Sequence, residues 1–434
     1  MVLKLKGILG LYLTRGGIVG LNFITLLTIA AIMPKAEFGN FVFLWAFVQV
    51  LSSVAGVGGP PYLLREGSVR QGNPEKGLSR NEAIKISLIW PFCILFLMSL
   101  IAVMLFDNFL DSFGSAKTSY KSCIIFLSAY LIILTINSAI PFRLNGRVEL
   151  AMFIRDGAPH IILLSSAFLA KHFFVLDAIS ILLLFNIISA MFVTILVIWI
   201  TQLEAPLWRE TTSTSGAGSG QIYFWGSNVL SKLTAQIDII IGGYFLTSVD
   251  LGQYQILKRL TNLLMLPQVI ANWLVIVRIG KSFAQRKYED VQAACHTSLI
   301  MSFFPALLIL VVLAFIFPII QNVYDLPEGG YIWKVFFFLG LGNLISVACG
   351  MNFTVASQCG QESQIMLVKI IGIVVVSLII LMFTDSLTGV SLAGAVFCSI
   401  AISNIYLYVI ILNRLKIDTS ILSLIRRKKN YDNI

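Results

Sequence analysis

Twelve stretches of about 20 mostly apolar residues follow one another along almost the whole chain, and this pattern leaves few folds open. A helix of that length crosses the roughly 30 Å hydrocarbon core of a bilayer. Hydrophobic residues make up 58% of the 434 residues and charged residues only 12%, which is too apolar for a water-soluble globule. We therefore predict an all-α polytopic membrane protein. The expected spans cover about residues 11–34, 38–60, 84–106, 120–141, 157–176, 178–201, 221–246, 251–275, 291–320, 331–355, 364–384 and 389–413.

Lysine and arginine are distributed unevenly between the two ends of these spans. With the N-terminus inside, most of the 31 basic residues fall on cytoplasmic segments, whereas the opposite loops carry only Lys35, Lys117, Lys121 and Lys171. The positive-inside rule therefore predicts that both termini are cytoplasmic. The net charge of +10 is then mainly a topology signal and does not favour nucleic-acid binding. Arg15 interrupts the first apolar run, so we do not expect a cleaved signal peptide.

A short motif recurs in the two halves of the chain. Residues 37–41 (Glu-Phe-Gly-Asn-Phe) follow the first span, and residues 250–254 (Asp-Leu-Gly-Gln-Tyr) follow the seventh. A five-residue match is also compatible with a shared helix-start signal, but it divides the spans into two sets of six and predicts two parallel six-helix lobes. The polar, glycine- and serine-rich segment between them is typical of a flexible tether. The expected divisions are an N-terminal lobe at 1–205, a cytoplasmic linker at 206–220 and a C-terminal lobe at 221–434 with a basic cytoplasmic tail.

The charged side chains within the predicted spans are mainly positive. An ionisable group at the bilayer centre costs at least ~2.5 kcal/mol on insertion scales, so each one requires a physical reason. Lys232 lies about eleven residues into the seventh span, on a helical face that also carries Asn228 and Gln236. We expect such faces to line a water-filled cavity. The candidate cavity cations are Arg15, Lys232, Lys258 and Arg259, and the expected supporting polar residues are Asn22, Asn228, Gln236, Asn262 and Lys369.

Simpler roles stay open for several of these residues. Arg15 and Lys369 lie near helix ends, from which a long basic side chain can extend to the lipid headgroups. Lys258 and Arg259 are adjacent, so at most one of them points squarely into a cavity. Asp238 is the one deep acidic residue, and it is either the partner of a side chain on another helix or a coupling site for a proton or cation.

The sequence shows no recognisable catalytic or cofactor-binding arrangement. It has no phosphate-binding glycine loop, no cluster with metal-ligand spacing and no paired carboxylates beside a long external loop. The six cysteines lie in or beside predicted spans without paired spacing, so neither a disulfide framework nor a metal site is expected. We therefore predict a protein that is not an enzyme and needs neither cofactor nor metal.

Several segments resemble a known family. They are residues 37–41, 49–58 (Gln-Val-Leu-Ser-Ser-Val-Ala-Gly-Val-Gly), 63–65 (Leu-Leu-Arg), 236–238 (Gln-Ile-Asp) and 251–254. These segments look like those of bacterial polysaccharide biosynthesis membrane proteins. Those are the O-antigen and related lipid-linked-oligosaccharide flippases of the multidrug/oligosaccharidyl-lipid/polysaccharide exporter (MOP) superfamily.

This resemblance implies two lobes in a V shape and a central cavity whose cations meet the pyrophosphate of an undecaprenyl-linked glycan. The implied activity is translocation of an O-antigen, capsule or exopolysaccharide repeat unit from the cytoplasmic to the outer leaflet by alternating access. The implied location is the bacterial cytoplasmic (inner) membrane. The expected partners are the lipid-linked oligosaccharide, membrane lipids, a polysaccharide polymerase and a chain-length regulator, and no nucleic acid.

Two other functions remain open. A multidrug and toxic-compound extrusion-type exporter of the same superfamily typically uses an acidic residue in the N-terminal lobe, whereas the first span here has Arg15 and no carboxylate. A membrane polymerase or ligase acting on the same lipid-linked glycan usually carries its catalytic residues in a sizeable external loop. The longest external loop expected here covers only about residues 107–119.

Overall fold

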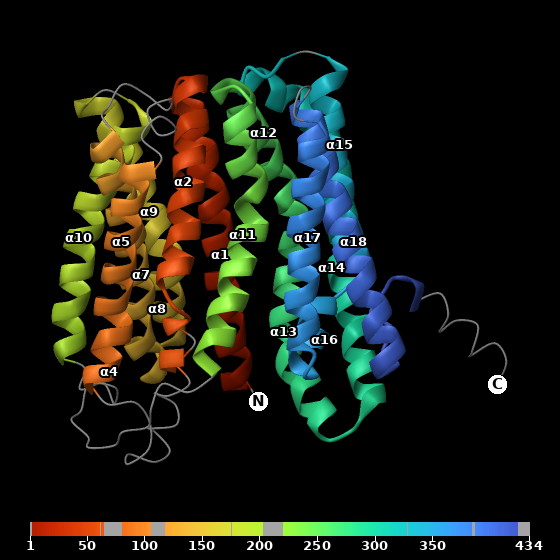
Figure 1. The fold of residues 1–434 in the computed structure, drawn as a ribbon. Helices are drawn as coiled ribbons and strands as arrows, with labels where there is room; N and C mark the ends of the chain where they lie inside the picture. The colour runs from red at the N-terminus through yellow and green to blue at the C-terminus, as the bar shows by residue number, and fades with distance from the viewer. Residues whose placement is uncertain are drawn as a thin grey trace, which may run out of the picture. The chain divides into compact units, whose positions relative to one another are not determined.

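The computed structural model describes residues 2–60, 62–64, 80–105, 118–174, 176–202, 220–327, 329–383 and 387–423. Within these ranges the regular structure is entirely helical (Figure 1). Nine of the described helices are long and apolar enough to cross a membrane. The prediction of an all-α polytopic membrane protein is therefore confirmed.

Contacts between residues group the chain into two compact units, Met1–Ile240 and Ile241–Ile434. The described helices of the first unit are α1 (Val2–Ile32), α2 (Lys35–Ala55), α4 (Arg80–Ile84), η1 (Lys85–Ile89), α5 (Trp90–Leu105), α7 (Thr118–Leu144), α8 (Val148–Met152), η2 (Phe153–Gly157), α9 (Ala158–Phe173), α10 (Ala178–Gln202) and most of α11 (Gly220–Phe245). Most of the predicted linker, residues 206–219, lies outside the described residues. The lobe boundaries therefore stay a prediction.

The long helix α7 is the centre of the first unit, where it packs against α2, α5 and α10. Its apolar side chains are buried on several faces, and polar groups join it to α10. Ser128 donates a hydrogen bond to the Asn186 side-chain oxygen at 2.7 Å, and the Asn186 amide donates to the Ile124 carbonyl at 3.1 Å. Because these buried polar side chains are hydrogen-bonded to each other, the bonds offset the cost of removing them from water and join α7 to α10.

The second unit repeats this arrangement of neighbours. Its described helices are α12 (Ser248–Asn262), η4 (Leu263–Met265), α13 (Leu266–Ala284), α14 (Tyr288–Val323), α15 (Gly330–Ala348), α16 (Asn352–Gln358), α17 (Glu362–Met382) and α18 (Gly389–Leu415). Here α15, the counterpart of α7, packs against α12, α14 and α18. The same order of contacts in both units agrees with an internal repeat.

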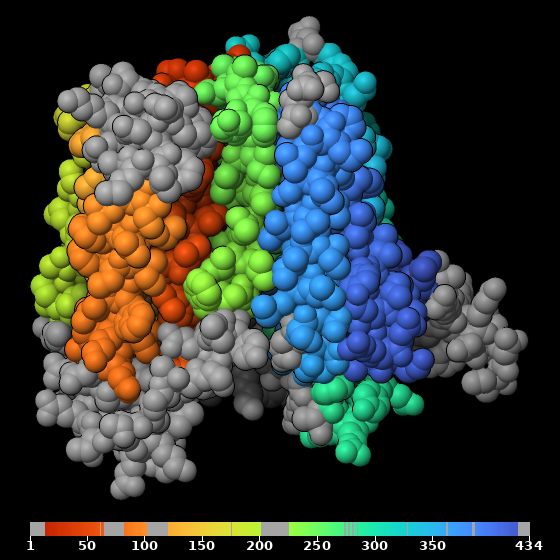
Figure 2. Space-filling model, viewed as in Figure 1, coloured from red at the N-terminus to blue at the C-terminus, as the bar shows by residue number. Residues whose placement is uncertain are grey.

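One face of α17 carries a row of large, exposed apolar side chains. Leu367, Ile370, Val374, Leu378 and Leu381 follow one another at intervals of three or four residues. That spacing places them on one side of the helix. The helix lies on the face of the molecule shown in Figure 2. Such a row is suited to contact with lipid rather than with water.

A short segment after α18, residues 416–423, crosses the ends of other helices, and we call it the C-terminal strap. The side chain of Gln292 on α14 accepts a hydrogen bond from the Asp418 backbone N–H at 2.8 Å and donates to the Asp418 carbonyl at 2.6 Å. The Ile421 N–H donates to the Ala348 carbonyl at 2.9 Å. Gly350 has a positive φ of 73°, and an added Cβ would lie 2.1 Å from the Thr419 carbonyl oxygen. Only glycine therefore fits beneath the strap at this position.

Candidate functional site

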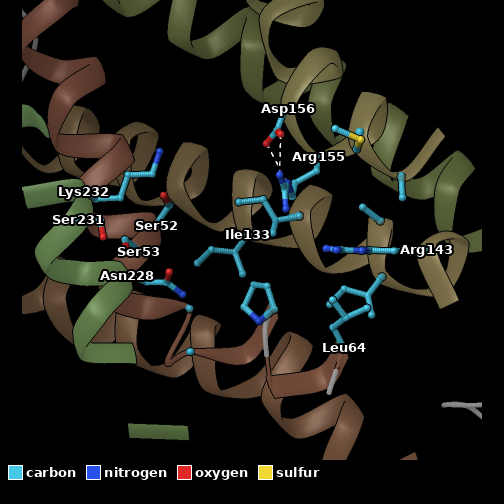
Figure 3. Close-up of a pocket in the computed structure, with 18 residues that line it drawn as sticks. Ser52, Ser53, Leu64, Ile133, Arg143, Arg155, Asp156, Asn228, Ser231 and Lys232 are labelled. Carbon is cyan, nitrogen blue, oxygen red and sulfur yellow. Dashed lines mark hydrogen bonds and ion pairs between the residues drawn. The ribbon is translucent and has the colours of Figure 1, made fainter. Parts of the chain in front are cut away.

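The first unit contains a pocket of about 410 Å³ where α2 and α7 end and α9 begins. It is lined by Ser52, Ser53, Gly56, Gly58, Pro60, Leu64, Ile133, Ile136, Ala139, Ile140, Arg143, Ala151, Met152, Arg155, Asp156, Asn228, Ser231 and Lys232 (Figure 3). These residues come from the end of α2 and the turn after it, from α7, from α8 and η2, and from α11. All of them belong to the first unit.

The first wall of the pocket is an interruption of helical structure inside a predicted span. Helix α2 ends at Ala55, and Val57 and Gly58 follow with positive φ angles of 46° and 66°. A positive φ is unfavourable for β-branched valine, so the surrounding contacts must hold this turn in place. The Gly59 N–H donates to the Gly56 carbonyl at 2.7 Å, and the Trp225 indole donates to the Val54 carbonyl at 2.8 Å. Gly56 and Gly58 of this turn line the pocket directly.

The second wall is built by a short π-helix. In η2 the Ala158 N–H bonds to the Phe153 carbonyl, five residues earlier. Such π-turns are rare and occur frequently at functional sites. This one carries Arg155 and Asp156, whose side chains lie side by side (Figure 3). Arg155 Nε donates to one carboxylate oxygen of Asp156 at 2.9 Å, and an Arg155 terminal nitrogen donates to the other at 2.7 Å.

A second guanidinium group contacts the same carboxylate. Arg15 on α1 donates to the Asp156 oxygen that Arg155 also contacts. Burial by itself raises the pKa of Asp156, but the hydrogen bond and charge of Arg155, and then the charge and hydrogen bond of Arg15, lower it. The pKa is held below its ordinary value of 3.8. Asp156 is therefore ionised at neutral pH.

The third wall comes from α11. Lys232 lines the pocket together with Asn228 and Ser231, and its ammonium group donates to the Gln49 side-chain oxygen at 3.5 Å. The Gln236 amide donates to the same oxygen at 3.3 Å. In Figure 3, Lys232 and Arg143 lie on opposite sides of the pocket.

Positive charge dominates the lining. Arg143, Arg155 and Lys232 contribute three cationic side chains, and Asp156 contributes one carboxylate. The remaining polar groups are the hydroxyls of Ser52, Ser53 and Ser231 and the amide of Asn228, whereas most of the other side chains are apolar. This combination can hold an anion against the charged wall and a hydrocarbon group against the apolar one.

Only some of the predicted site residues of the first unit line the pocket. Lys232 and Asn228 line the pocket, and Arg15 lies behind the pocket-lining Asp156. Gln236 is buried on α11 and joined to Gln49 as described above. Two further residues complete this set: Asn22 is partly buried on α1, and Asp238 is buried on α11.

The other predicted cavity residues belong to the second unit. Lys258 and Arg259 are partly buried on α12, and Lys369 is partly buried on α17. Asn262 is exposed, and its side-chain oxygen accepts a hydrogen bond from the Asn343 amide at 3.3 Å. A cavity shared by these residues and Lys232 stays a prediction.

Sequence reasoning missed Arg143, Arg155 and Asp156. In the sequence, the two arginines belong to the basic cytoplasmic segments of the positive-inside pattern and indicate topology alone. Asp156 directly precedes a predicted span, and nothing in the sequence indicates that it pairs with Arg15, 141 positions away. The available signal was the concentration of charge in the short stretch between the fourth and fifth spans.

The described residues offer neither a metal-binding cluster nor a disulfide. Among them, no group of three or more His, Cys, Asp or Glu side chains is placed to hold a metal ion. All six cysteines are free. Burial raises the pKa of the Cys359 thiol, which lies between α16 and α17, to about 11. That thiol is therefore protonated at neutral pH and has little nucleophilic character.

Comparison with solved structures identifies the architecture. An inward-facing multidrug resistance MATE family transporter of the MOP superfamily aligns with a TM-score of 0.67 and 14% identity, over 91% of this chain and 93% of that chain. An outward-facing multidrug resistance MATE family transporter aligns with a TM-score of 0.59 and 14% identity, over 92% and 93% of the two chains. The chain has the fold of the MOP-superfamily transporters. No protein-family model and no curated protein matches the sequence.

A third matched structure also belongs to the MOP superfamily. It is a transporter from Pyrococcus furiosus, described as having a binding pocket of reverse polarity that suggests a different function. It aligns with a TM-score of 0.61 and 14% identity, over 92% and 94% of the two chains. Both this structure and the inward-facing one are described as transporters of the MOP superfamily. Identity at this level shows the fold, and membership of the O-antigen flippase family stays a prediction.

Proposed function

We propose that this protein is a flippase that moves an undecaprenyl-pyrophosphate-linked oligosaccharide from the cytoplasmic to the outer leaflet by alternating access. The observation that carries the proposal is the positive charge of the pocket, with Arg143, Arg155 and Lys232 facing it. Like charges in a low-dielectric site repel one another and are stabilised by a bound anion. A pyrophosphate offers several oxygens, and guanidinium groups bind such oxygens in pairs.

The apolar part of the lining supports a lipid-linked anion over a soluble one. The pocket is also lined by the apolar side chains of Leu64, Ile133, Ile136, Ile140 and Met152. They would contact the first isoprenoid carbons while the arginines hold the pyrophosphate. The ends of α2 and α7 are expected at the cytoplasmic surface, where a lipid-linked repeat unit is assembled before export.

The fold supports the mechanism. Inward-facing and outward-facing MATE transporters both align with this chain over more than nine-tenths of its length. The superfamily fold therefore accommodates both states that alternating access requires. The change from the inward-facing to the outward-facing state would carry the sugar head group across the membrane while the polyprenyl chain stays in the lipid.

A second candidate is the multidrug exporter of the MATE type, whose fold this chain shares. A site for organic cations needs negative or aromatic groups, whereas this lining is net positive. The Pyrococcus furiosus transporter, with its pocket of reverse polarity, supports the view that pocket charge separates functions within one fold. Pocket charge is therefore the property to test.

The test is deletion of the gene, followed by leaflet-specific detection of lipid-linked repeat units. Complete units should accumulate on the cytoplasmic leaflet and be cleared by the wild-type gene. They should not be cleared by a variant carrying Arg143→Gln, Arg155→Gln and Lys232→Gln at equal protein level. Accumulation on the outer leaflet would instead indicate a polymerase or ligase. Efflux of cationic dyes, driven by proton or sodium entry, would establish the multidrug exporter.

A further inference from the structure

Asp156 is a negative group built into a positively charged pocket. Both of its carboxylate oxygens accept hydrogen bonds from Arg155, and one of them also contacts Arg15. About a quarter of its side-chain surface stays exposed, at 28%. The carboxylate is thus paired on one side and reachable from the pocket on the other.

We propose that Asp156 is an internal counter-ion that competes with the ligand's phosphate groups for Arg155 and so sets how tightly the pocket holds an anion. The inference rests on the proposed function, because it assumes a phosphorylated ligand in this pocket. It assigns Asp156 a positioning and affinity-limiting role beside the cations that touch the ligand.

The competition follows from the geometry of the guanidinium group. Asp156 occupies the edge of Arg155 formed by Nε and a terminal nitrogen, and this edge also binds phosphate in a bidentate manner. A phosphate that takes the edge must displace the carboxylate. A phosphate that binds at Arg143 or at Lys232 instead still meets the repulsion of Asp156. In both cases the carboxylate weakens binding.

Such weakening has a use in transport. A carrier must release its cargo on the far side, and a pocket of unopposed cations would hold a pyrophosphate too firmly. Because Asp156 neutralises Arg155 whenever the ligand leaves, it lowers the free energy of the empty pocket. Release is therefore favoured without a second ligand.

Arg15 is the second partner of Asp156 and remains available when a ligand binds Arg155. It lies on α1, which packs against α8, η2 and α9. Gly16, Gly17 and Gly20 follow it along α1, and a Cβ at any of them would meet no atom within 4 Å, so the side of α1 that carries these glycines is open. When a ligand draws Arg155 away, Asp156 keeps Arg15 as its partner and the carboxylate stays charged and held.

The experiment measures the affinity of inorganic pyrophosphate for the purified protein in detergent by isothermal titration calorimetry. Asp156→Asn keeps the size of the side chain and removes its charge, so binding should tighten roughly three- to tenfold. Arg15→Gln removes a positive charge and leaves Arg155 as the partner that must neutralise Asp156. Pyrophosphate binding should therefore weaken. Glu149→Gln is the matched control, because Glu149 is exposed on α8 and is not part of the pocket lining, and it should change affinity less than twofold.

The sign of the Asp156→Asn effect decides between the possible roles. A purely structural ion pair predicts that Asp156→Asn and Arg15→Gln both weaken binding, and that result would overturn the counter-ion proposal. If Asp156→Asn does not fold, Asp156→Glu provides the second measurement, and it should bind pyrophosphate as the wild type does. A wild-type protein that binds neither pyrophosphate nor an isoprenyl pyrophosphate would refute the proposed function itself.

Discussion

The carboxylate of Glu37 accepts a hydrogen bond from the backbone N–H of Ala178 at 3.2 Å, so the start of α2 caps the start of α10. The first N–H groups of a helix have no partner within it, and a negative charge is favourable there. At the matching position of the repeated motif, Asp250 bonds instead with Thr247, which caps its own helix α12. The acidic residue of the motif therefore lies at a helix N-terminus in both halves. Glu37 bonds to the start of another helix, α10, whereas Asp250 bonds within the start of its own helix, α12.

Removal of the Glu37 cap should destabilise the first unit. We expect Glu37→Ala to cost about 1 kcal/mol of stability, because the α10 N–H loses its acceptor. Glu37→Gln should cost less, since an amide oxygen can still accept the bond. Thermal unfolding in detergent measures the effect. Glu149→Ala, at an exposed position, is the control, and an equal loss in both variants would contradict the capping role.

Lys232 should matter for transport more than for folding. It lines the pocket and is exposed, so Lys232→Ala should impair glycan export while the amount of protein in the membrane stays nearly unchanged. Lys232→Arg should retain more export, because it keeps the charge. Lys171→Ala, an exposed lysine on α9, serves as the control. Normal export by the alanine variant would remove Lys232 from the anion site.

The apolar part of the pocket should be detectable with a short isoprenoid. Farnesyl pyrophosphate should bind at least tenfold more tightly than inorganic pyrophosphate, since each buried CH₂ contributes about 0.8 kcal/mol. Leu64→Ser should reduce this advantage and leave the affinity for inorganic pyrophosphate unchanged, because Leu64 is on the apolar wall. Calorimetry with both compounds tests this. Equal affinities in the wild type would argue that the pocket holds only the head group.

The ion pairs of Asp156 should stabilise the protein over a defined pH range. The pKa of this carboxyl is lower in the folded state than its ordinary 3.8, so its contribution is present above that value and is lost as the pH falls through the folded pKa. The stability difference between wild type and Asp156→Asn should be constant between about pH 5 and 8 and shrink below about pH 4. Thermal unfolding across this range measures it. A change centred near pH 6 to 7 would contradict the lowered pKa.

The C-terminal strap should depend on Gln292. Gln292→Ala removes both hydrogen bonds to the Asp418 backbone and should accelerate hydrogen exchange in residues 416–423, particularly at the Asp418 amide. Exchange measured by mass spectrometry detects the change. Gln358→Ala, at the exposed end of α16, should leave the exchange unaltered. Unchanged protection in the Gln292 variant would show that other contacts suffice to hold the strap.

The helices could be predicted because span length and hydropathy are local properties of the sequence. The eighth predicted span, 251–275, extends further than expected, as α12, η4 and α13 continue to Ala284. The pocket could be predicted only in part. Lys232 and Asn228 were found because they share one face of one helix, whereas Arg15 and Asp156 meet only through the packing of α1 against η2. No periodicity within a segment encodes a contact of that kind.

The π-turn at η2 makes the charge of the pocket depend on the length of the chain. Compared with an α-helical turn, Phe153–Gly157 contains one extra residue. Deleting that residue would join α8 to α9 as one uninterrupted helix and rotate one against the other by about 100°. Arg155, Asp156 and the α8 residues Ala151 and Met152 could then no longer all face the pocket. The loss of a single codon would thus change which charges face the pocket, while the hydropathy pattern and the number of spans stay nearly the same.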